Sequence, residues 1–221
     1  EIRLSLVGSE MCIRDSIDAV QVAGKLPINF HELGATTLAA SAHKFGGPRG
    51  IGLLLARRTP APLPLAFGGG QERGIRPGTV DVASASALAA ALRESVADME
   101  QEETRLTALR DKLKAGIESS IDNVIINSAE PTLASHLHVS FPGTDGDSLI
   151  MLLDAAGIEA SAGSACHAGV NRMSHVLEAM GIDEEHGRGS LRFSLGRMTT
   201  DEDIDVVIKE LPEIIRRARS V

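Results

Sequence analysis

The stretch Ser41-Ala42-His43-Lys44-Phe45-Gly46-Gly47-Pro48-Arg49-Gly50-Ile51-Gly52 places one lysine between a histidine and a glycine-rich turn. Glycine lets a backbone turn tightly and approach a ligand closely. A lysine that loses part of its hydration in such a turn becomes a nucleophilic amine, which makes Lys44 a candidate nucleophile toward a carbonyl compound. The alternative is a solvated surface lysine, the usual state of this residue type.

Length and composition limit the class of protein. The 221 residues are 43% hydrophobic and 24% charged, which is typical of a globular chain with one or two domains. The formal net charge of −8 argues against a nucleic-acid partner, and no apolar run is long enough to cross a bilayer. The first residues carry no secretory signal pattern, so we expect a cytoplasmic protein without a structural disulfide between Cys12 and Cys166.

Residues 1–16 differ in pattern from the rest of the chain. They show no sustained hydrophobic period and run into Ile17 without a turn signal. We predict that they are a non-native segment, a translated adapter joined to a truncated reading frame, and they do not enter the functional argument. A divergent strand and loop is the alternative.

From Ile17 onward, the hydrophobic pattern alternates between the periods of strands and helices and predicts an α/β fold. The continuous apolar run 51–55 predicts a strand covered on both faces. A helical region over about 82–119 could link two domains, and Thr200 is a candidate N-cap of the last helix. We expect strands over 17–21, 38–42, 50–56, 123–126, 136–141 and 190–195 and one ending at 160, and helices over 146–156, 174–180 and from 201 onward.

Five motifs follow one another along the chain: Asp18-Ala19-Val20-Gln21, Ser41-Ala42-His43-Lys44, Gly68-Gly69-Gly70-Gln71-Glu72-Arg73-Gly74-Ile75-Arg76-Pro77-Gly78-Thr79, Ser161-Ala162-Gly163-Ser164-Ala165-Cys166 and Leu191-Arg192-Phe193-Ser194-Leu195-Gly196-Arg197. In their order and spacing, the chain resembles the C-terminal part of a group I cysteine desulfurase, a pyridoxal-phosphate enzyme of the class V aminotransferase family. The resemblance implies a truncated type I pyridoxal-phosphate-dependent transferase fold. Residues 17–98 are then the second half of the large cofactor-binding domain, and residues 99–221 are the small C-terminal domain.

The resemblance also implies how the cofactor pyridoxal 5'-phosphate is bound. Lys44 forms the covalent link to it and later moves the α-proton of the substrate. Asp18 pairs with the pyridine nitrogen, which keeps the ring protonated and able to accept electrons. Gln21 bonds the phenolic oxygen. For Asp18, a turn or helix-cap aspartate is the alternative.

Three further residues match family positions around the cofactor phosphate. A hydroxyl and an imidazole N–H are suitable donors to a dianion, which fits Ser41 and the candidate catalytic residue His43. Thr79 corresponds to a residue that reaches the phosphate of the partner subunit and so implies a homodimer. A strand hydroxyl bonded to backbone for Ser41, and a flexible surface loop over 68–78, are the alternatives.

The resemblance assigns the sulfur acceptor to Cys166 and the substrate carboxylate to Arg192. A loop of small residues suits a mobile thiolate, and a guanidinium binds a carboxylate in a bidentate way. A buried structural cysteine and an exposed strand arginine are the alternatives. A metal site at Cys166, His167 and His175 is not expected, because their spacing is not that of metal ligands.

The implied reaction converts L-cysteine to L-alanine and leaves a persulfide on Cys166, which passes sulfur to an acceptor or scaffold protein for iron–sulfur clusters or tRNA thiolation. Another class V enzyme, such as a selenocysteine lyase, or a non-catalytic partial chain stays open. The N-terminal portion of the family, with the histidine that stacks on the cofactor ring, has no counterpart here. We therefore expect the chain alone to be poorly active.

Overall fold

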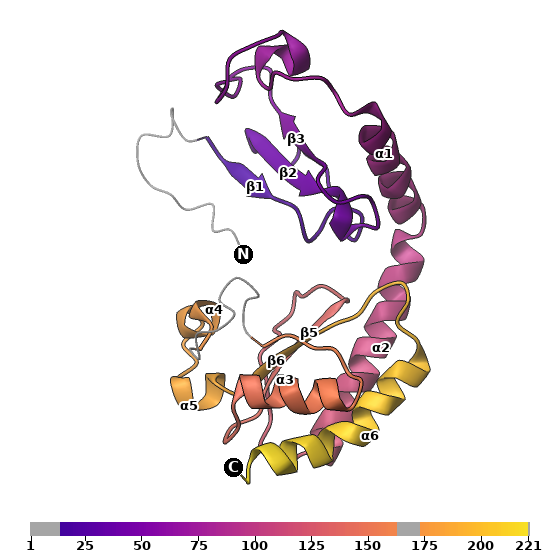
Figure 1. Ribbon diagram of the computed structural model, residues 1–221, viewed down its shortest axis with the longest axis vertical. Coiled ribbons are helices and arrows are strands. Elements are labelled where there is room, and N and C mark those ends of the chain that lie inside the picture. The colour runs from indigo at the N-terminus through magenta and orange to yellow at the C-terminus, as the bar shows by residue number, and fades with distance from the viewer. Residues whose placement is uncertain (1–13, 163–172, 221) are drawn as a thin grey trace. The chain divides into compact units, whose positions relative to one another are not determined.

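A computed structural model describes residues 14–162 and 173–220 of the chain. The chain divides into two compact units, Glu1–Met99 and Glu100–Val221, each with a three-stranded sheet (Figure 1). This division lies beside the boundary expected between residues 98 and 99, and the assignment of the units to a large and a small domain stays a prediction. So does the non-native origin of residues 1–16, of which 1–13 lie outside the described residues.

The sheet of the first unit has the order β1 (Ser16–Asp18), β2 (Thr37–Ser41), β3 (Gly52–Ala56), with β1 parallel and β3 antiparallel to β2. A small core packs the sheet and the turn after β2 against helix α1 (Val82–Ala97). Its buried members are Ala23, Ala40, Ala42, Phe45 and Leu88.

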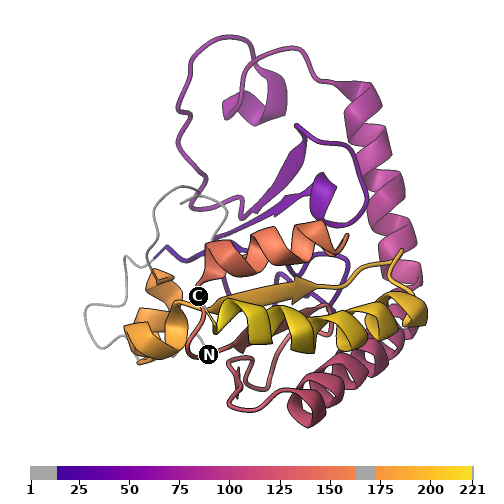
Figure 2. The same ribbon diagram turned by 60° about the horizontal axis from the view of Figure 1, so that its bottom comes forward.

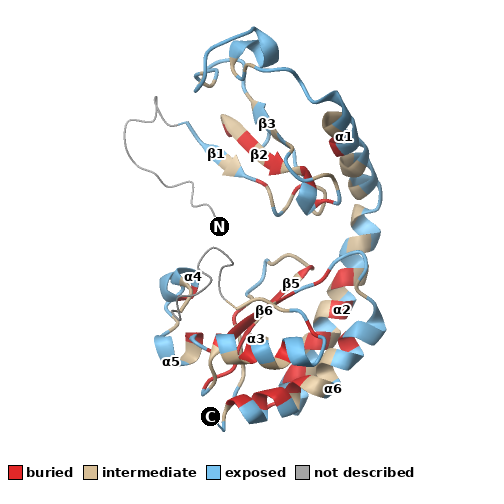
Figure 3. Ribbon diagram, in the orientation of Figure 1, coloured by how far each residue is buried: buried red, intermediate tan, exposed pale blue. Residues whose placement is uncertain are grey.

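The expectation that the run 51–55 is covered on both faces is wrong for the described residues. β3 pairs with β2 alone, and the side chains of Leu54 and Leu55 are 52% and 42% exposed. Helix α1 is also largely uncovered, with Leu88 as its buried residue (Figure 3). An apolar run predicts a strand, but it does not say whether anything covers that strand.

The helical region expected over 82–119 is two helices, α1 and α2 (Met99–Ser120). The C-cap of α1 is Asp98. Leucine and isoleucine on one side of α2 belong to the core of the second unit: Leu106, Leu109, Leu113 and Ile117.

The second unit is an antiparallel sheet packed against helices. Its strand order is β4 (Ile125–Ile126), β5 (His136–Ser140), β6 (Ser190–Ser194). The apolar residues of β5 and β6 join a core with α2, α3 (Gly146–Ala155) and α6 (Asp201–Ala218), and α3 and α6 lie side by side (Figure 2). Because side chains alternate along a strand, the polar residues of β5 and β6 share the opposite face.

Most predicted elements of the second unit are confirmed within a residue or two. Thr200 caps α6, in a capping box with Asp203. The strand expected to end at residue 160 is only a bridge between Ser161 and Arg192. The short helices of this unit are α4 (His175–Ala179) and α5 (Glu184–Gly187). Among the described residues, every helix is too short or too polar to traverse a bilayer.

Gly189 precedes β6 at a point where the backbone of another segment comes close. A Cβ there would overlap the hydroxyl of Thr144 and would lie 2.6 Å from the carbonyl oxygen of Phe141. The Phe141 N–H donates to the Gly189 carbonyl over 2.9 Å, so the two backbones cannot separate without losing that bond.

Replacing Gly189 with alanine is expected to lower the free energy of unfolding by about 1–3 kcal/mol, because a backbone atom cannot yield as a side chain can. Gly196→Ala is the matched control, because a Cβ there has no heavy atom within 4 Å, and its effect is expected to stay within about 0.5 kcal/mol. Urea denaturation of both variants measures the difference. Equal stabilities would contradict this account of the contact.

Candidate active site

Asp18 and the lysine motif, which are predicted to bind the cofactor, lie at the carboxyl ends of two parallel neighbouring strands. β1 and β2 pair with Ile17 opposite Leu38 and Asp18 opposite Ala39. Asp18 ends β1, and Ser41 ends β2 two residues beyond Ala39. The carboxyl ends of parallel strands are where α/β proteins bind ligands, so Asp18 and the residues after β2 share the edge suited to a site.

A tight turn holds the lysine motif at this edge. After β2 the chain forms the 3-10 turn η2 (Ala42–Lys44). The Ala42 N–H donates to Ile51, and the Ala42 carbonyl accepts from Phe45 and Gly47. A Cβ on Gly47 would lie 2.8 Å from that of Ala42, so the turn can close this tightly because position 47 is glycine.

Polar groups of three predicted residues are already engaged in local hydrogen bonds. The exposed carboxylate of Asp18 accepts from the Val20 N–H over 2.9 Å. Ser41 Oγ and His43 Nδ1 are 2.7 Å apart, so hydroxyl and imidazole are held as one pair beside the turn. The pair offers its remaining hydrogen-bonding groups to a ligand.

Lys44 is exposed, so the described residues do not supply the burial expected to desolvate its amine. They do supply a second amine, which sequence reasoning missed. Lys25 is half-buried, and burial, followed by the positive charge of Lys44, lowers the pKa of Lys25. The two lysines are near each other because their neighbours, Gly24 and Phe45, come close. A Cβ on Gly24 would lie 3.2 Å from that of Phe45.

The structure places Gln21 in the turn after β1 and Thr79 in the segment before α1, and both are exposed. Thr79 follows the 3-10 element η3 (Gln71–Gly74) and Gly78, whose φ of +118° is one that L side chains rarely adopt. The roles of Gln21 and Thr79 stay predictions.

In the second unit, Arg192 lies on β6 directly opposite His138 on β5. Its Nε is buried without a hydrogen-bond partner among the described residues, and its Nη2 lies 3.5 Å from Ser161 Oγ. A buried guanidinium nitrogen without an acceptor is costly unless a ligand supplies one, which suits an anion site. Cys166, the predicted sulfur acceptor, lies outside the described residues.

A polar network beside Arg192 was not predicted from the sequence. The buried amide of Asn127 donates from Nδ2 to His138 Nδ1 over 2.9 Å and to Ser140 Oγ over 2.8 Å. Burial, followed by the positive charge of Arg192, lowers the pKa of His138. The signal in the sequence was the alternation His136-Leu137-His138-Val139-Ser140, which puts three polar side chains on one face of a strand.

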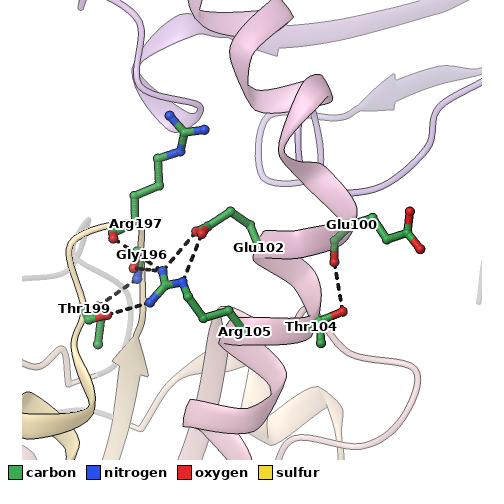
Figure 4. A network of polar contacts seen from close by, with 7 residues as sticks. All are labelled: Glu100, Glu102, Thr104, Arg105, Gly196, Arg197 and Thr199. Atoms are coloured by element: carbon green, nitrogen blue, oxygen red, sulfur yellow. Dashed lines mark hydrogen bonds and ion pairs between the residues drawn. The ribbon is translucent and has the colours of Figure 1, made fainter.

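Arg105 of α2 fixes the turn after β6 (Figure 4). Its guanidinium donates to the carbonyls of Thr199 at 2.7 Å, Gly196 at 3.0 Å and Arg197 at 3.4 Å. It also pairs with Glu102 at 2.9 Å, and this hydrogen bond raises the pKa of Arg105 and lowers that of Glu102. The strand that carries Arg192 is thereby fixed at its carboxyl end.

Comparison with known proteins identifies the family. Residues 12–207 match the family model described as aminotransferase class-V, and the chain belongs to this family. It is 47% identical over 218 residues to the IscS-like cysteine desulfurase of Mycobacterium tuberculosis (98% of this chain, 56% of that protein). It is 40% identical over 205 residues to the cysteine desulfurase NifS of Azotobacter vinelandii (92% and 51%). The chain thus spans about half the length of the curated relatives it matches.

Solved structures of similar proteins support the same family assignment. A NifS-like protein superposes with a TM-score of 0.82 at 35% identity, over 91% of this chain and 52% of that one. SspA, solved in complex with cysteine, gives a TM-score of 0.65 at 30% identity, over 83% and 50%. The predicted α/β class, the type I pyridoxal-phosphate-dependent fold and the resemblance to cysteine desulfurases are confirmed.

The lowered pKa of His138 predicts how stability depends on pH. As the pH falls, His138 binds a proton in the unfolded chain before it does so in the folded chain. The contribution of His138 is therefore complete above its unfolded pKa, about 6.5, and is lost as the pH falls below that value. Between about pH 7.5 and pH 5.5, the wild type should lose more free energy of unfolding than His138→Gln, as measured by urea denaturation. Equal losses would show that the folded chain protonates His138 as readily as the unfolded chain.

Proposed function

We propose that the chain is part of a pyridoxal-phosphate-dependent cysteine desulfurase, which converts L-cysteine to L-alanine and transfers the sulfur to Cys166. The observation that carries the proposal is the shared edge of β1 and β2, where Asp18 ends one strand and Lys44 follows the other. Membership of the class V family and the names of the relatives support it.

The donor chemistry at this edge fits the cofactor. Asp18 offers a carboxylate for a protonated pyridine nitrogen, Lys44 offers an amine for an aldehyde, and Ser41 with His43 offers a hydroxyl and an imidazole for a phosphate. When bound, pyridoxal phosphate supplies an electron sink for the α-carbon of an amino acid.

In the proposed mechanism, each residue holds or moves a defined group. The Asp18 carboxylate keeps the proton on the ring nitrogen, and Ser41 and His43 hold the phosphate. The Lys44 amine takes the α-proton of the substrate. Arg192 binds the α-carboxylate, and its buried Nε without an acceptor supports this role.

Cys166 would receive the sulfur. Its thiolate attacks the substrate sulfur, so that an S–S bond forms while the C–S bond breaks. The electron pair of the broken C–S bond goes to the substrate Cβ, which gains a proton, and Lys44 returns a proton to Cα, so that the product is L-alanine. The persulfide then passes to an acceptor protein of iron–sulfur cluster assembly or tRNA thiolation. We place the working enzyme in the cytoplasm, as a homodimer in which Thr79 reaches the partner's phosphate.

Lys44 can be tested by covalent trapping. The chain is incubated with pyridoxal phosphate and reduced with borohydride, and the labelled peptide is identified by mass spectrometry. We expect the label on Lys44, because this amine follows the strand next to Asp18, and expect its loss in Lys44→Met. Lys25→Met is the matched control and should keep the label. A label that persists in Lys44→Met would overturn the cofactor assignment.

Cys166 can be tested by product analysis. With L-cysteine and pyridoxal phosphate, alanine formation should fall to background in Cys166→Ala, because no thiolate then takes the sulfur. Cys12→Ala should match the wild type. Undiminished alanine formation in Cys166→Ala would exclude the persulfide route and favour another class V reaction.

A further inference from the structure

The pairing of β5 with β6 places His138 directly opposite Arg192. The Arg192 N–H and carbonyl bond Ser161, at 2.7 and 3.2 Å. The His138 N–H donates to Ser128 Oγ, and its carbonyl accepts from Asn127. The backbones of the two residues therefore do not hydrogen-bond each other, which makes His138 and Arg192 a non-hydrogen-bonded pair of the antiparallel ladder. In such pairs the Cα atoms are about 4.5 Å apart and the side chains lie closer than in hydrogen-bonded pairs.

The Asn127 amide fixes the proton of the neutral imidazole. A side-chain amide nitrogen is only a donor, so His138 Nδ1 must accept the 2.9 Å bond from Asn127 Nδ2. Nδ2 also donates to Ser140 Oγ over 2.8 Å, while Oδ1 of the same amide is buried without a hydrogen-bond partner among the described residues. Nε2 of His138 then carries the hydrogen, and the described residues offer it no acceptor.

The positive charge of Arg192 also favours the neutral form of the His138 ring. Arg192 lies opposite His138 on β6, and His136 lies two residues along on the same face of β5. Burial and the Arg192 charge both hold the pKa of His138 down, so the ring is a neutral donor near pH 7. Arg192 and His138 thus present a buried guanidinium nitrogen and an imidazole N–H on one face of the sheet.

We propose that His138 is a second substrate-binding donor, whose Nε2–H bonds the carboxylate that Arg192 binds, with Asn127 as the positioning residue that sets its tautomer. The inference rests on the proposed function and deepens it, because it assigns the recognition of an α-carboxylate to two side chains of the second unit. Asn127 acts only through His138 and does not touch the substrate.

The first test reads the tautomer directly. With histidine labelled by nitrogen-15, the two ring nitrogens of His138, assigned by their loss in His138→Gln, should show a neutral ring protonated at Nε2 near neutral pH. In Asn127→Ala, the ring should become a mixture of tautomers, because the donor to Nδ1 is gone. A wild-type ring protonated at Nδ1, or charged, would overturn the inference.

The second test measures carboxylate binding. L-alanine, the expected product, is titrated into the full chain and into each variant by isothermal titration calorimetry, and ethylamine, which lacks the carboxylate, serves as the negative ligand. His138→Leu should weaken L-alanine binding about tenfold, the effect of losing one hydrogen bond to a charged group. His138→Gln, which keeps an N–H donor, should restore most of it. His136→Leu is the matched control, because its partner on β6 is Ser194, and it should bind like the wild type.

The outcomes separate this inference from the proposed function. If Arg192→Leu abolishes L-alanine binding while His138→Leu does not weaken it, the second donor is wrong and the Arg192 assignment stands. If wild-type chain does not bind L-alanine at all, the carboxylate site and this inference are both overturned. If both residues matter while the borohydride label is absent from Lys44, the cofactor assignment fails and the anion site survives.

Discussion

The parallel pairing of β1 with β2 is the constraint on which the candidate cofactor site depends. Parallel strands end at one edge, so Asp18 and the turn after Ser41 meet there although 22 residues of chain separate them. The tight turn at Ala42 and Gly47 then sets where Lys44 emerges. An antiparallel pairing of the same two segments would put Asp18 at the opposite end of β2 from the lysine motif.

The second unit shows a different principle, in which one face of a small sheet packs a core and the other carries the polar residues of the proposed carboxylate site. Leu137, Val139 and Leu191 alternate with His138 and Arg192, so the residues that stabilise the sheet also fix the register of the polar pair. A shift of one residue between β5 and β6 would exchange the two faces. The apolar core therefore determines which histidine lies opposite the arginine.

Much of the fold and part of the candidate site could be predicted from the sequence, and the exceptions have physical reasons. Periodicity and capping chemistry gave the helices and strands of the second unit and the cap at Thr200, because those signals are local. The exposure of Leu54 could not be predicted, since it depends on what packs against β3. Asn127 and Lys25 were missed because what marks them comes from the tertiary structure: Asn127 bonds His138, and Lys25 is half-buried near Lys44. The motif around Arg192 identified this residue as a candidate, but it could not show that the Nε of Arg192 is buried.

The way Arg105 holds the turn after β6 has a consequence for sequence change. Its guanidinium bonds main-chain carbonyls at Gly196, Arg197 and Thr199, and a carbonyl is present whatever the side chain. A change of side chain at residue 197 therefore leaves all three acceptors of Arg105 in place. A lysine at position 105 would instead lack the planar fork that spans several acceptors.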